Sequence, residues 1–127
     1  MAEAKKYEIE VRVETQYLSD QSEPETGRHL FSYTTTVINT GTVAAQLISR
    51  HWVITDAEEQ VQEVRGLGVV GHQPLLKPGQ EFEYTSWTRL DTPSGTMQGT
   101  FFCMTEEAQA FQAPVGEFAL TPASALH

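Results

Sequence analysis

The chain has 127 residues, of which 39% are hydrophobic and 20% are charged, a composition typical of a single folded domain. Its 17 acidic residues outnumber its 8 basic residues and give a net charge of −9, which excludes a general affinity for DNA or RNA because the surface repels phosphate backbones. No apolar run approaches the roughly 18 residues of a membrane span, and the first six residues contain no apolar signal core, so we expect no membrane association.

Two strands are predicted in the first third of the chain. From Tyr7 to Tyr17 apolar and polar residues alternate, which predicts a strand with one buried and one solvated face. Residues 19–27 are polar and include proline and glycine, which predicts an exposed, mobile loop. The aromatic and β-branched residues from His29 to Asn39 predict a long second strand. The turn residues Asn39 to Gly41 then predict an antiparallel return.

The third strand is predicted from Ala44 to Thr55, and a turn over Asp56–Glu59 leads to a short fourth strand from Gln60 to Val64. Strict alternation divides the third strand into two faces: Ile48, Arg50, Trp52 and Ile54 on one, and Leu47, Ser49, His51 and Val53 on the other. The fourth strand then runs directly into a glycine-rich segment.

The segment from Val64 to Pro74 carries Gly66, Gly68 and Gly71 at the G-x-G-x-x-G spacing of dinucleotide-binding loops. That motif requires a helix at its end, whereas Val69 and Val70 favour a strand and Pro74 would break a helix that began there. The segment is therefore predicted to be a glycine-rich connection between strands. At least one of its glycines should have φ > 0. We expect Gly66 or Gly68 to be conformational, and Gly71 with His72 to lie on an exposed binding surface.

The C-terminal half contains three more predicted strands and one ambiguous connection. Gly99 indicates a bulge or a close approach, and residues 105–109 form either one helical turn or a loose hairpin. The tails 1–5 and 122–127 are expected to fray. The strands are Glu81 to Trp87, Met97 to Met104, and a final one over Phe111–Val115 and Glu117–Leu120 that is interrupted around Pro114 and Gly116.

Seven to eight short antiparallel strands without a convincing helix predict an all-β fold, a single immunoglobulin- or fibronectin-type-III-like β-sandwich spanning residues 1–127. Cys103, the one cysteine, sits among apolar residues and is predicted to be a buried thiol, which favours a reducing, cytoplasmic location. The predicted core comprises Trp52, Ile54, Phe82, Tyr84, Phe101 or Phe102, Val11 and Val13.

Five segments together resemble the ApaG family, in order and over nearly the whole chain: residues 49–56, 66–74, 77–79, 84–86 and 95–99. The resemblance implies a fibronectin-type-III-like sandwich, a cytoplasmic protein, and a genetic association with cobalt and magnesium efflux. Related domains occur as modules in eukaryotic interaction proteins and F-box proteins. The chain departs from the family pattern in residues 105–109, where many members have a glycine in the hairpin turn, and at Gly116.

No metal, cofactor or catalytic site is predicted. The four histidines are separated by twenty or more residues, without the close ligand spacing of a metal site. The carboxylates of Asp56, Glu58, Glu59 and Glu63 suit magnesium by type, but we expect a solvated turn. Ser49 and Ser86 lie in predicted strands outside any nucleophile elbow, so a non-enzyme is expected.

Two functions remain open. The first is a protein–protein interaction module that docks a partner through a loop or an edge strand. The second is a site for a small phosphate-bearing anion, pyrophosphate or a nucleotide, on the amides of residues 66–71. The net charge favours the first, and a homodimer stays open. The candidate binding residues are Gly66, Gly68, Gly71, His72, Arg50, His51 and Arg65.

Overall fold

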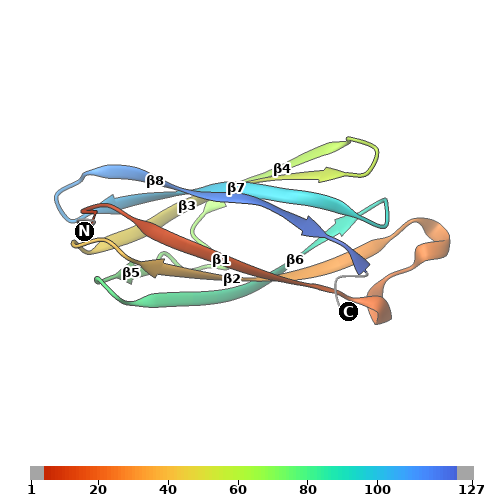
Figure 1. Ribbon diagram of the computed structural model, residues 1–127, viewed down its shortest axis with the longest axis horizontal. Helices are drawn as coiled ribbons and strands as arrows, with labels where there is room; N and C mark the ends of the chain where they lie inside the picture. The colour runs from red at the N-terminus through yellow and green to blue at the C-terminus, as the bar shows by residue number, and fades with distance from the viewer. Residues whose placement is uncertain (1–4, 123–127) are drawn as a thin grey trace, which may run out of the picture.

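The computed structural model describes residues 5–122, which form eight strands in two antiparallel sheets (Figure 1). The first sheet has the order β1-β2-β6, with β1 at Ile9–Tyr17, β2 at His29–Asn39 and β6 at Glu81–Leu90. The second has the order β4-β3-β7-β8, with β4 at Val61–Leu67, β3 at Ala45–Asp56, β7 at Gly95–Thr105 and β8 at Ala110–Leu120; β5, at Leu75–Leu76, pairs with β3. The predicted all-β sandwich is confirmed.

The core lies between the two sheets and is centred on Trp52, whose side chain is 1% exposed. Its ring packs edge-on against Tyr33, Phe101 and Phe118, with ring centroids 5.6, 5.7 and 6.1 Å away. The predicted core is confirmed, with Phe101 rather than Phe102 buried, and with Val11, Val13 and Phe82 partly buried at its margin. Cys103 is also buried, as predicted, and burial raises the pKa of its thiol to about 11.

The predicted division of β3 into two faces is wrong at its beginning. Its pairing with β7 shifts between Leu47 and Ser49, so that Ile48 is an extra residue in the ladder. An extra residue reverses the alternation of side chains. Leu47 is consequently buried on the same side as Trp52, whereas the prediction placed the two on opposite faces.

Two other elements differ from the predictions, and residues 105–109 adopt the hairpin, one of the two alternatives left open for them. The fourth strand continues to Leu67, so Gly66 lies within β4 and pairs with Arg50. The final strand is a single element, β8, and its predicted interruption is a register shift opposite Met97 and Gly99 of β7. Residues 105–109 form a hairpin turn closed by the Thr105 amide on the carbonyl oxygen of Gln109, at 3.0 Å. Ala108, within this turn, has φ of 62°.

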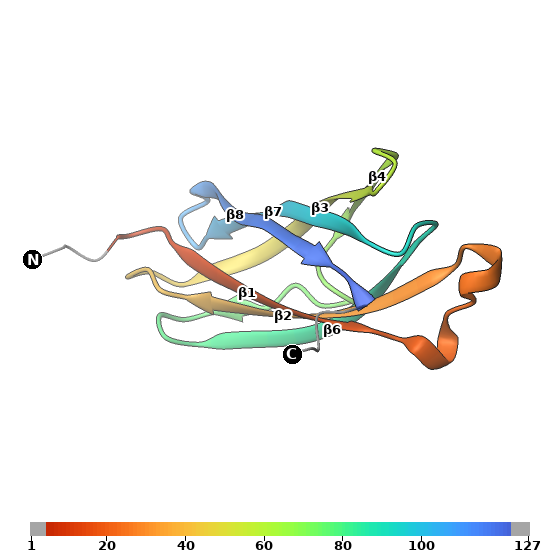
Figure 2. The ribbon, with the colours of Figure 1, turned by 45° about the vertical axis from the view of Figure 1, so that its right-hand side comes forward.

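One side of the sandwich is closed and the other is open. On the closed side β1 packs against β8, which joins the margins of the two sheets. On the other side the edge strands are β4 and β6, and β4 projects at the top of the molecule in Figure 2. The loop after β1 forms two short 3₁₀ turns, Ser19–Gln21 and Pro24–Thr26. The tails predicted to fray lie almost wholly outside the described residues.

Candidate functional site

The glycine-rich segment forms a tight hairpin turn beyond β4. The amide of Val69 donates to the carbonyl oxygen of His72 at 2.7 Å, and the amide of His72 donates back at 3.0 Å. The two residues between them, Val70 and Gly71, have φ of 48° and 82°. Positive φ at both central positions defines a type I′ turn, the favoured connection of a two-residue hairpin. A glycine with φ > 0, as predicted here, is confirmed at Gly68 and Gly71.

Arg50 ties this hairpin to β3. Its Nη1 donates to the carbonyl oxygens of Leu67 and Gly68, at 3.2 and 2.8 Å. Gly66 lies directly opposite in the ladder, and a Cβ there would come within 2.8 Å of the same Nη1. Gly66 therefore leaves the space in which the guanidinium group of Arg50 lies.

Val70 occupies a backbone conformation that β-branched residues rarely adopt. Its φ of 48° is left-handed, and its side chain is 57% exposed, so little packing offsets the strain. Asparagine tolerates this conformation and is preferred before glycine in type I′ turns. We expect Val70→Asn to raise the free energy of unfolding by about 1 kcal/mol, measured by urea denaturation.

The matched control is Val61→Asn, because Val61 is equally exposed, at 60%, but is not among the residues with positive φ. Asparagine is unfavourable in a strand, so this variant should be neutral or slightly destabilised. A loss of stability in Val70→Asn would show that the valine side chain contributes more than its backbone strain costs.

Four of the seven predicted site residues border one hollow on the outer face of the five-stranded sheet, although the side chain of Arg50 lies on the inner face with those of Trp52 and Ile54. Arg50, His51, Arg65 and Gly66 line a hollow of about 530 Å³, together with Ser49, Leu67, Thr100, Phe102 and Gln112. We call this the outer hollow. Phe102 and Leu67 give it apolar walls, whereas Arg65 gives it positive charge and His51 an imidazole ring.

Glu63 partly neutralises this charge. Its Oε1 lies 2.7 Å from Nε2 of His51 and 3.3 Å from Nη2 of Arg65. The hydrogen bond with His51 lowers the pKa of Glu63 below its usual value of 4.5, and the charge of Arg65 acts in the same direction. The carboxylate is thus held in its charged form between two basic groups. An anion that binds to His51 or Arg65 would have to compete with Glu63.

Gly71 and His72 lie apart from the outer hollow. His72 is exposed, and its ring packs 5.5 Å from that of Phe82 on β6, in the other sheet. Nothing lies within 4 Å of the position of a Cβ on Gly71, which agrees with its predicted exposure. Gly71 is also conformational, like Gly68, because its φ of 82° is left-handed.

A second cavity lies between the two sheets at their open side, and sequence reasoning did not predict it. This inter-sheet cleft has a volume of about 400 Å³, and no carboxylate lines it. Its polar groups and aromatic rings come from strands distant in sequence. The lining residues are Tyr33, Arg50, Ile54, Gln62, Val64, Val70, Tyr84, Ser86, Trp87, Thr88 and Arg89.

Tyr84 lines the cleft, but its hydroxyl is buried in the core. The residue is 7% exposed, and its Oη forms no hydrogen bond of regular geometry among residues 5–122. Burial raises the pKa of Tyr84 to about 12, so the hydroxyl stays protonated and can donate. The buried polar groups of Thr35 and Trp52 lie beside this oxygen, and both act as hydrogen-bonding groups that lower the pKa of Tyr84.

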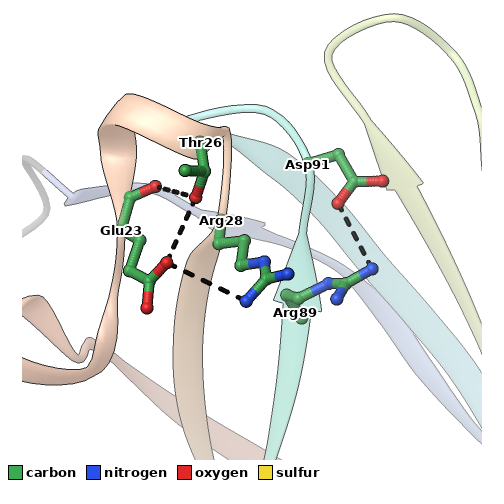
Figure 3. A network of polar contacts seen from close by, with 5 residues as sticks. All are labelled: Glu23, Thr26, Arg28, Arg89 and Asp91. Atoms are coloured by element: carbon green, nitrogen blue, oxygen red, sulfur yellow. Dashed lines mark hydrogen bonds and ion pairs between the residues drawn. The ribbon is translucent and has the colours of Figure 1, made fainter.

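Arg89 stands at the opposite end of the cleft from the hairpin, in a different electrostatic setting. Its Nη2 lies 3.5 Å from Oδ1 of Asp91, as Figure 3 shows. In the same view Arg28 approaches Glu23, at 3.8 Å, and Thr26 donates to the Glu23 carbonyl oxygen at 3.1 Å. Both arginines are therefore partly matched by carboxylates, which leaves Arg50 as the cation that dominates the cleft.

The acidic turn after β3 is a structural feature. Oδ1 of Asp56 accepts hydrogen bonds from the amides of Glu58 and Gln60, at 2.8 and 2.9 Å. Within residues 5–122, no three His, Cys, Asp or Glu side chains are grouped in a way that could hold a metal ion. The same residues include no helix long and apolar enough to cross a membrane.

Two antiparallel sheets around a single tryptophan, with no α-helix in the described chain, define an immunoglobulin-like β-sandwich. The model of the ApaG domain matches residues 19–105, and the chain belongs to the ApaG family. It is 59% identical to the protein ApaG of Ralstonia nicotianae over 122 residues, 96% of this chain and 98% of that protein. It is 57% identical to the protein ApaG of Thiobacillus denitrificans over the full length of both.

Solved structures agree with this assignment. A crystal structure of the putative ApaA protein from Bordetella pertussis is 53% identical in sequence and superimposes with a TM-score of 0.91, covering 94% of this chain and 97% of that one. A protein from Archaeoglobus fulgidus, 12% identical with a TM-score of 0.51, shares the fold alone.

Proposed function

We propose that this ApaG-family protein is a non-catalytic interaction module that binds an extended segment of another protein along the free edge of β4. The observation that carries the proposal is the gathering of exposed apolar side chains at this edge. Val61, Leu67 and Val70 are 60%, 76% and 57% exposed, and all three lie on β4 or the hairpin turn after it. An unpaired strand flanked by apolar side chains is the surface on which strand addition occurs.

The other three edge strands carry features that discourage strand addition. Charged residues alternate along β1, where Glu10, Arg12 and Glu14 are exposed. The β8 edge contains Pro114 and a register shift, and both disrupt pairing. The exposed face of β6 begins with Glu81 and Glu83. The ladder of β6 is also uninterrupted, but β6 carries one exposed large apolar side chain, Trp87, whereas β4 and its turn carry three. We therefore assign the β4 edge to a partner.

The anion alternative receives less support from the hairpin. The amides of Gly68 and Val69 already donate to the carbonyl oxygens of Ile48 and His72, so they do not converge on a free site. An anion nest requires successive amides that point into one concavity. Arg50 likewise directs Nη1 to backbone carbonyls of the hairpin.

The absence of catalysis and the cytoplasmic location are parts of the same proposal. The hydrogen-bonded histidines of residues 5–122 contact Glu63 and Tyr17, rather than a serine, threonine or cysteine. A buried lone cysteine suits a reducing compartment. The link with cobalt and magnesium efflux that the family resemblance implies fits an interaction role, because such a role does not require the chain to bind the metal.

The test is Arg65→Pro, compared with Arg65→Ala. The Gly68 amide donates to the carbonyl oxygen of Ile48, and the Asp56 amide donates to the carbonyl oxygen of Gln60. In this register the backbone N–H and C=O groups of the even-numbered residues of β4 point to β3. Backbone groups alternate in direction along a strand, which points the amide of Arg65 to the free edge. A proline there removes an edge donor without removing a bond to β3.

Proteins retained from a cell extract by the wild type and by Arg65→Ala, but lost with Arg65→Pro, are the expected partners. With one such partner purified, hydrogen exchange should slow at the outward amides of Glu63 and Arg65 in the complex. Urea denaturation of Arg65→Pro verifies that the sandwich is intact. Equal retention of every partner by the folded proline variant would exclude the β4 edge as the docking surface.

A further inference from the structure

We propose that the inter-sheet cleft is a binding site for a small ligand that combines a planar aromatic ring with one carboxylate or phosphate group. The inference is independent of strand addition at β4. The cleft volume of about 400 Å³ lies within the range of about 300–1,000 Å³ typical of small-molecule sites. Residues from both sheets line it, so a ligand would be enclosed between layers rather than rest on a surface.

The charge of the cleft selects an anion. The protein has a net charge of −9, yet the residues that line the cleft include two arginines and no carboxylate. Only Nη1 of Arg50 is engaged, and within residues 5–122 neither Nε nor Nη2 has a hydrogen-bond partner. Two free donors of one guanidinium group match the paired oxygens of a carboxylate or phosphate.

Tyr84 forms the wall of the cleft that faces Arg50. Its hydroxyl is buried beside Thr35 and Trp52, so the aromatic ring rather than the oxygen would contact a ligand. Arg50 and Tyr84 come from opposite sheets, so the ligand would lie between the guanidinium group and this ring.

The aromatic side chains of the cleft select the ring. Tyr33, Tyr84 and Trp87 line it, and Trp87 is 62% exposed although tryptophan is seldom left in water. Aromatic pairs attract one another beyond the area they bury, because the edge of one ring complements the face of the other. A planar ring at the mouth of the cleft would cover the indole of Trp87 and the side chain of Val70.

Val70 gives an independent reason to regard the cleft as functional. The valine is held in a left-handed conformation that disfavours it, and its side chain lines the cleft. Backbone strain concentrates at binding sites, where a side chain is retained for its contacts rather than for stability. We therefore expect Val70→Asn to gain stability and lose ligand affinity.

The probes are 2-naphthoate and 2-naphthyl phosphate, with neutral 2-naphthamide as the control for the charge. Amide NMR shifts locate the binding site. We expect saturable shifts at Ser86, Trp87 and Thr88, and an affinity at least about tenfold above that of the amide. Comparison of the affinities of the two acids shows whether the cleft prefers a carboxylate or a phosphate group. Binding of neither acid, or shifts confined to Thr100, Phe102 and Gln112 in the outer hollow, would overturn the proposal.

Variants separate the cleft from the outer hollow, which Arg50 also lines. Arg50→Met should weaken binding by about tenfold or more, whereas Arg65→Ala, which removes an arginine of the outer hollow alone, should leave it unchanged. Trp87→Ala should weaken binding several-fold with an intact fold, so the test holds even if Arg50→Met loosens the hairpin. Unchanged affinity in Trp87→Ala and Val70→Asn would contradict a site in the cleft.

Discussion

Replacement of Trp52 by alanine should lower the free energy of unfolding by about 3–5 kcal/mol, the cost of removing a large aromatic side chain from a packed core. Trp52 is 1% exposed and contacts aromatic rings from β2, β7 and β8, so neighbouring side chains from both sheets would border the cavity. Collapse of one sheet onto the other is limited because the strands are fixed in their ladders. Urea denaturation at neutral pH measures the effect.

Two variants serve as controls for Trp52→Ala. Trp87→Ala removes an indole that is 62% exposed and should change stability by less than about 0.5 kcal/mol. Trp52→Phe leaves a smaller cavity and also removes the unpartnered Nε1 donor, so it should cost less than the alanine variant. Equal losses in Trp52→Ala and Trp87→Ala would contradict the burial of Trp52.

The sequence predicted the strands whose signals are local. Alternation along β1 and the β-branched, aromatic run of β2 identified both elements, the second with the observed limits. Turn residues located the connections, because glycine, proline and asparagine restrict the backbone wherever they occur. Burial of Trp52 followed from its place in the middle of an apolar strand face.

The errors arose where pairing with a distant strand decides the structure. The extra residue at Ile48 exists only relative to β7, about fifty residues later, so alternation within β3 could not reveal it. Gly66 lowers strand propensity, yet the ladder with β3 extends past it to Leu67. In both cases the tertiary partner overrides the local pattern.

The site was predicted only in part, because it too depends on the pairing of strands that are distant in sequence. Arg65 and Gly66 were candidates because they belong to the glycine segment, and Arg50 and His51 because they were expected to lie near it in space. The pairing of β3 with β4 brings the four together. The inter-sheet cleft depends on which edges remain open, whereas alternation along β6 only places Tyr84 and Trp87 on opposite faces of the strand. An exposed tryptophan on a polar strand face was the one sequence signal available.

The glycine hairpin should show graded responses to alanine, and the largest belongs to Gly68. Its φ of 63° is unfavourable for alanine, and a Cβ there would overlap the carbonyl oxygen of His72, which is backbone and part of the turn. Left-handed strain and overpacking together should lower the free energy of unfolding by about 3 kcal/mol. The hydrogen bond of Val69 to the same carbonyl would be lost first.

Gly71→Ala and Gly66→Ala separate the two causes of this effect. Gly71 has φ of 82° with open space around it, so its variant should show the strain alone, about 1–2 kcal/mol. Gly66 has no positive φ, and its Cβ would meet the mobile end of Arg50, so a change within about 1 kcal/mol is expected. Urea denaturation of all three variants gives the order Gly68, Gly71, Gly66. If Gly66→Ala were the most destabilised variant, the hydrogen bonds from Arg50 to the hairpin would contribute more to stability than the left-handed conformation of the turn glycines.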